Sequence, residues 1–181
     1  MTINRSDERF TICLHESGHG TAGIILGGRV GGILLVADGG LAHVDELSPD
    51  SHAFMVAAGP AAESLAADHE APDTPQASYQ DIATAEFPEG TDRSFVWSCG
   101  FADVEGGLRT AKSDDRSLAE WAIGGVEQYP EQWERRIKLA RRVAAEIVRD
   151  HEAAIVRIAK RLFIHGRVTG DEIKQLMRGQ E

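Results

Sequence analysis

Residues 15–19 are His-Glu-Ser-Gly-His, set within a stretch of otherwise mostly apolar residues. On an α-helix, residues at i and i+4 lie one above the other, about 6 Å apart, so two imidazoles can hold one ion between them. Imidazole nitrogen is a natural ligand of Zn²⁺. Glu16 is rotated by about 100° from His15, which brings its carboxylate near a water on that ion without making it a ligand. The pattern predicts a metal-binding helix.

The surrounding sequence supplies such a helix and a small hairpin. Residues 6–26 are expected to form the helix, which the glycines at 27–28 end. Residues 30–47 hold two short β-type runs joined by Asp-Gly-Gly at 38–40, which favours a hairpin. A two-stranded hairpin is therefore expected to follow the helix that carries the motif.

The next segments are helical or irregular. Residues 52–67 are apolar and rich in alanine, which predicts a mostly buried helix with a kink or break at Gly59-Pro60. Residues 68–77 have the composition of a loop, and Ser78 is expected to cap a short helix that carries residues 81–86. Residues 88–116 show no clear period and predict loop and partial helix only.

The remainder of the chain has a plain helical pattern. From Pro130 an apolar stripe recurs at helical spacing, with a joint between two helices expected at Asp150-His151. Thr169-Gly-Asp-Glu172 is a capping-box sequence, and it predicts a last short helix that runs through Met177.

These elements define the expected fold class as mainly α with a small β hairpin or sheet, an α+β arrangement with a helical C-terminal part. The 181 residues are expected to form a single domain. Within it, residues 1–86 hold the metal site, residues 87–129 are an uncertain segment, and residues 130–181 are the C-terminal helical part.

Charge, cysteine content and hydropathy exclude several classes of protein. The net charge is −10; residues 1–133 carry 7 basic against 22 acidic side chains, whereas residues 134–181 carry 12 against 7. An acidic front repels phosphate backbones, so nucleic acid is not an expected partner. Two cysteines are too few for a disulfide framework. The polar start and the interrupted apolar run at 22–37 predict no signal peptide and no membrane span, hence a cytoplasmic protein.

Catalytic zinc usually has three protein ligands and one open position, so a third ligand is needed. The spacing does not decide between Glu63 and Asp81. Other candidates are Asp68 and His69, with the weaker His43 and His52 in or near the hairpin.

Four blocks occur in an order that resembles one known family. They are HESGHGTAGIIL, AAGPAAESLAA, SYQDIATAEF, and the tail that begins WERRIKLARRVAAEIV and ends with GRVTGDEI. Together they resemble the peptidase domain of the FtsH-type ATP-dependent zinc metalloproteases, with a zincin-like HExxH helix. The resemblance covers roughly residues 15–67, 78–86 and 130–178.

The resemblance implies roles for individual residues. It makes His15, His19 and Asp81 the zinc ligands and Glu16 the general base. Glu63 matches the family's buried Glu in the second helix, which implies a group that orients a ligand, or an alternative ligand. The family's ATPase module and transmembrane helices have no counterpart ahead of the motif, so activity without ATP is expected, on polypeptides that are unfolded or delivered by a separate unfoldase or adaptor. Family members form rings, so self-association is a further expectation.

The sequence therefore predicts a zinc metalloendopeptidase that hydrolyses peptide bonds by attack of a zinc-bound water, with an extended peptide beside the hairpin. Two alternatives are kept. One is a non-proteolytic zinc-containing binding or regulatory protein with the same fold, and the other is a metal-dependent hydrolase of small amides.

Overall fold

The structure is a computed structural model of the whole chain. It describes residues 5–36, 39–73, 114–124, 126–127 and 129–180. The predicted cap at Ser78 and the predicted ligand Asp81 lie outside these residues. Within them the chain is mainly helical with a small antiparallel sheet, so the α+β prediction is confirmed.

The metal-binding motif lies on a long first helix that packs against the sheet. Helix α1 spans Arg5–Ile25, and strands β1 (Arg29–Val36) and β2 (Gly39–Asp45) form the predicted antiparallel hairpin. Gly27, with a φ of 83°, lies in the left-handed region that favours glycine, and it lets the chain turn from α1 into β1.

A third strand, β3 (Arg167–Thr169), pairs antiparallel with the other edge of β1, with Ile33 opposite Val168. The sheet order is β2-β1-β3, so β2 is an edge strand among the described strands. The sequence pattern missed β3 because three residues are too few to show a two-residue period.

Helix α2 spans Pro49–Ala62 and continues as a 3₁₀ turn, η1, over Glu63–Ala67. The N-cap is Ser48, whose hydroxyl accepts a hydrogen bond from the Ser51 N–H at 3.2 Å. The helix does not break at Pro60, which lies inside it. The geometry changes to 3₁₀ only after Ala62, with Glu63 as the first residue of η1.

The remaining helices are α6 (Asp114–Ile123), α7 (Pro130–Asp150), α8 (Glu152–His165) and α9 (Gly170–Met177). The joint at His151 and the capping box at Thr169 and Glu172 are as predicted. Helix α6 lies within the uncertain segment 87–129, and only its first three residues fall in the range 88–116, for which the sequence predicted loop and partial helix.

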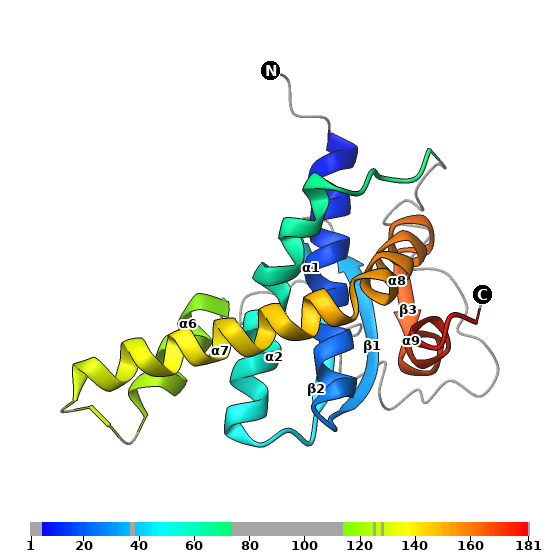
Figure 1. Cartoon of the computed structure of the whole chain (residues 1–181). Coiled ribbons are helices and arrows are strands. Elements are labelled where there is room, and N and C mark those ends of the chain that lie inside the picture. Colours follow the sequence, from blue (N-terminus) through cyan, green and yellow to red (C-terminus); the bar gives the residue numbers. More distant parts are fainter. Residues whose placement is uncertain (1–4, 37–38, 74–113, 125, 128, 181) are drawn as a thin grey trace.

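Two clusters of buried apolar side chains hold these elements, and α1 contributes to both. One cluster joins α1 to the sheet, α8 and α9, with Leu14, Ile155 and Ile173 fully buried. The other joins α2, α6 and α7 to α1, chiefly through alanines and Leu118. Figure 1 shows α1 crossing between α8 and α9 on one side and α2, α6 and α7 on the other. The motif helix is thus fixed from both sides.

Within the described residues, none of the helices combines the length and the apolar character that crossing a membrane would require.

Candidate metal centre

Helix α2 crosses very close to the face of α1 that carries the two histidines, and glycine makes this possible. A Cβ on Gly59 would lie 2.4 Å from His19 Nε2 and 2.7 Å from His15 Nε2. On the α1 side, a Cβ on Gly18 would lie 2.5 Å from the carbonyl oxygen of Ala58. Real side-chain atoms do not approach so closely, so the absence of side chains at both positions lets the backbone of α2 cover the histidines.

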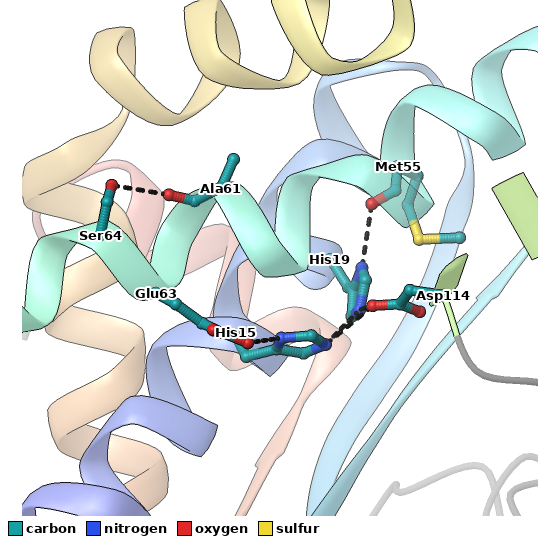
Figure 2. Close-up of polar contacts among 7 residues, drawn as sticks. All are labelled: His15, His19, Met55, Ala61, Glu63, Ser64 and Asp114. Carbon is teal, nitrogen blue, oxygen red and sulfur yellow. Dashed lines mark hydrogen bonds and ion pairs between the residues drawn. The ribbon is translucent and has the colours of Figure 1, made fainter. Parts of the chain in front are cut away.

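Each histidine is oriented by a hydrogen bond at Nδ1. His19 Nδ1 lies 2.9 Å from the carbonyl oxygen of Met55, to which it donates. His15 Nδ1 lies 2.6 Å from Glu63 Oε1. Figure 2 shows both bonds reaching from α1 to the helical segment formed by α2 and η1. A proton on each Nδ1 leaves the Nε2 lone pair of the neutral ring available for another partner.

The Nε2 atoms of the two rings point toward one another and toward Asp114. The two Nε2 atoms lie 3.0 Å apart, and Asp114 Oδ2 lies 2.9 Å from that of His15 and 3.2 Å from that of His19. Asp114 is the first residue of α6. Of the His, Cys, Asp and Glu side chains that the structure describes, these three form the group able to hold a metal ion.

The chemistry of this group fits a bound cation. With Nδ1 protonated on both rings, three electron-pair acceptors meet with no hydrogen between them, and Asp114 Oδ2 is buried without a hydrogen-bond donor. Such a contact is repulsive unless a proton or a metal ion lies between the atoms. Two ligands of a tetrahedral Zn²⁺ are about 3.3 Å apart, close to the separations found here.

Without a metal ion, the pKa values of His15, His19 and Asp114 are shifted in the directions that favour positively charged histidines and an ionised aspartate. Burial alone would lower the pKa of His15, but hydrogen bonds that its protonated ring donates to Asp114 and Glu63, together with the charge of Glu16, raise it to about 9. The pKa of His19 is raised as well: its burial opposes the rise, and its hydrogen bond to Asp114 drives it. Burial works against ionisation of Asp114, yet the two histidines hold its pKa well below its ordinary value. The site attracts either protons or a metal cation.

Glu16 lies next to this group but does not join it. Its side chain is buried, and burial raises the pKa of its carboxyl group. The carboxylate accepts a hydrogen bond from the backbone N–H of Ala42 in β2. A Cβ on Gly40 would lie 2.4 Å from Glu16 Cγ, so glycine is required there. Strand β2 thus positions Glu16 beside the two histidines, as a general base for a metal-activated water would require.

The other ligand candidates from the sequence lie elsewhere. His69 Nε2 lies 2.9 Å from Glu152 Oε1, and His43 Nε2 lies 3.3 Å from Asp45 Oδ2. His52 is exposed on α2. Glu63 contacts Nδ1 of His15 rather than the point where the ligand atoms converge.

Asp114 was not among the residues that the sequence singled out. Acidic residues are common in the first turn of a helix, where they interact favourably with its dipole, so an Asp at this position carries no special signal. Its segment also has no clear period. A search for Asp at the start of any helix downstream of the motif would have included it.

Comparison with protein families gives an independent indication. Residues 2–67 match the family model described as Peptidase M50B-like. The matched segment contains both histidines, Glu16 and Glu63, and it ends before α6. The match relates this part of the chain to metallopeptidases, and it does not single out the FtsH-type family. A metallopeptidase relation implies a metal, commonly zinc.

A comparison of the chain with curated proteins gives no match.

Proposed function

We propose that the protein is a zinc-dependent metallopeptidase. The observation that carries the proposal is the convergence of His15, His19 and Asp114, with the two imidazole Nδ1 atoms already engaged. The family match over residues 2–67 supports the same class. Zinc, rather than another divalent ion, is favoured by two imidazoles and one carboxylate in close proximity.

Three side chains would hold the metal ion, namely His15, His19 and Asp114. Three protein ligands leave one coordination position for water or substrate, as in catalytic zinc sites. Glu63 would keep the ring of His15 in the required orientation and tautomer. The resemblance to the FtsH-type family instead makes Asp81 the third zinc ligand, and this residue lies outside the described residues. Asp114 and Asp81 are therefore alternative third ligands, which the Asp114→Asn and Asp81→Asn variants distinguish.

The chain's own residues account for proton movement. A zinc ion held by these residues would supply Lewis-acid chemistry that polarises the scissile carbonyl and lowers the pKa of the attacking water. Glu16 is placed to accept one proton from this water, whose oxygen bonds to the carbonyl carbon, and to pass the proton to the amine as the carbon–nitrogen bond breaks.

The substrate in this proposal is an extended polypeptide. Strand β2 is an edge strand among the described strands, and its Gly40 lies against Glu16. A peptide that adds to this edge by main-chain hydrogen bonds would pass the Glu16 carboxylate. Such binding reads the backbone more than the side chains, so unfolded chains, or chains delivered by a separate unfoldase or adaptor, are the proposed substrates, cleaved without ATP.

The experiment compares zinc-loaded wild type with Glu16→Gln on a fluorescently labelled unfolded protein, in the absence of ATP. We expect cleavage by the wild type only, with equal zinc content in the two proteins. Loss of zinc from Glu16→Gln would contradict the role given to Glu16. Equal cleavage by both would point to a contaminating protease. Zinc in both without cleavage by either would favour a non-proteolytic zinc protein.

A further inference from the structure

A pocket of about 320 Å³ lies between α2, α6 and α7. Residues of all three helices line it: Val56, Ala57, Pro60 and Ala61 of α2, Asp114, Asp115 and Leu118 of α6, and Arg141 of α7. The volume is enough for one large aliphatic or aromatic side chain with room for water at the opening.

Asp114 connects this pocket to the metal centre. Its carboxylate oxygen Oδ2 lies 2.9 Å from His15 Nε2, and the same residue forms part of the pocket wall. A group that binds at the metal therefore has the pocket as a neighbour, because Asp114 belongs to both. Helix α2 contributes to both, with Gly59 against the histidines and Pro60 and Val56 on the pocket wall.

The pocket walls are mostly apolar. Five of the lining residues are Val, Ala, Pro or Leu, and Leu118 is almost fully buried. The two other charged residues, Asp115 and Arg141, are exposed and of opposite sign. Moving a charged side chain from water into such a pocket costs desolvation that no single opposite charge offsets, whereas an apolar side chain gains from burial.

We propose that this pocket is a side-chain subsite of the metal centre, which accepts a large apolar residue of the polypeptide substrate next to the bond that is cleaved. The inference rests on the proposed function. It adds a preference for one type of substrate side chain, which main-chain binding along the edge of β2 does not supply. Main-chain pairing would choose extended segments, and the pocket would choose among them those with a large apolar residue at one position.

The test uses binding rather than cleavage. Acetohydroxamate is a small metal-binding probe, and the same hydroxamate carrying an isobutyl group adds one apolar side chain. Isothermal titration of both probes into the zinc-loaded protein should give about 10- to 100-fold tighter binding of the isobutyl probe. This advantage should fall to less than about threefold in Ala61→Phe, in which the new ring fills the pocket.

The matched control is Ala145→Phe, which adds the same ring at an exposed position of α7 outside the pocket lining. It should keep the full advantage of the isobutyl probe. Should Ala61→Phe fail to fold or to hold zinc, the smaller change Ala61→Leu replaces it, with a partial loss expected.

The outcomes separate this inference from the proposed function. Acetohydroxamate binding without any advantage of the isobutyl probe would refute the subsite and leave the metal centre standing. An advantage that survives in Ala61→Phe would place the apolar contact elsewhere and also refute it. Failure of both probes to bind the wild type would overturn the metal centre, and the subsite with it. Probe binding as expected, together with no cleavage of unfolded protein, would keep the subsite and reject the peptidase.

Discussion

Gly59 illustrates how a single residue sets the space at the metal centre. Glycine inside a helix costs about 1 kcal/mol relative to alanine, so its place in the middle of α2 calls for a compensating role. The compensation is the close approach of α2 to the rings of His15 and His19.

We therefore predict that Gly59→Ala lowers zinc affinity by about 10- to 100-fold, as is common for changes that displace ligating histidines. Competition with a chromogenic chelator would measure the affinity. Gly39→Ala is the matched control, because a Cβ there meets nothing within 4 Å. An unchanged affinity in Gly59→Ala would mean that the histidines do not need the close cover of α2.

The third ligand is also a question at the residue scale. Asp114→Asn should weaken zinc binding by at least about 10-fold, because the metal would lose a charged ligand, whereas Asp115→Asn next to it should have little effect. Zinc content after dialysis, measured by atomic absorption, distinguishes them. If Asp81→Asn lost zinc and Asp114→Asn kept it, the ligand set implied by the FtsH-type resemblance would be the correct one.

At the scale of elements, the start of α9 gives a prediction that is independent of metal. Burial would raise the pKa of Glu172, but hydrogen bonds from the Thr169 backbone N–H and hydroxyl lower it below its ordinary value of 4.5. A depressed folded-state pKa contributes stability that is present above the unfolded value and is lost as pH falls through the folded one.

Urea unfolding of wild type and Glu172→Gln should therefore differ by about 1 kcal/mol near pH 6, and by progressively less as the pH falls below 4.5. Lys174→Gln is a control on the same helix, because its ion pair with Asp171 is exposed. A difference that stayed constant down to low pH would show that the Glu172 charge has no part in the cap.

These elements also show what a sequence can predict. The HExxH helix, the hairpin and the capping box carry their signals in a few adjacent residues, since glycines, caps and helical spacing act locally. Strand β3 exists only because β1 offers it an edge, so its three residues have no signal of their own. Asp114 becomes a candidate ligand because α6 packs with α2 and α7, a tertiary contact that no local pattern contains.

At the scale of the whole molecule, the metal would join elements that are distant in sequence. The ligand atoms come from α1 and α6, and Glu63 of η1 supports one of them. A ligand that binds the folded state stabilises it by about 2.7 kcal/mol when its free concentration is 100 times its dissociation constant.

We predict that zinc raises the midpoint of thermal unfolding by several degrees and that a chelator reverses this rise. Differential scanning calorimetry on wild type and on a His15→Ala, His19→Ala double variant would check it, with no zinc-dependent shift in the variant. A similar shift in both proteins would mean that zinc binds outside the proposed centre.

The pairing of β1 with β3 has a consequence for folding during synthesis on the ribosome. Ile33 leaves the ribosome about 135 residues before its partner Val168. At ordinary rates of translation, roughly 7 to 27 seconds separate the two. During that interval one edge of β1 has no partner from β3, and a nascent chain in this state is open to pairing with a neighbouring nascent chain. Pairing at this edge can therefore begin only after β3 has been made, and we expect dependence on chaperones during that interval.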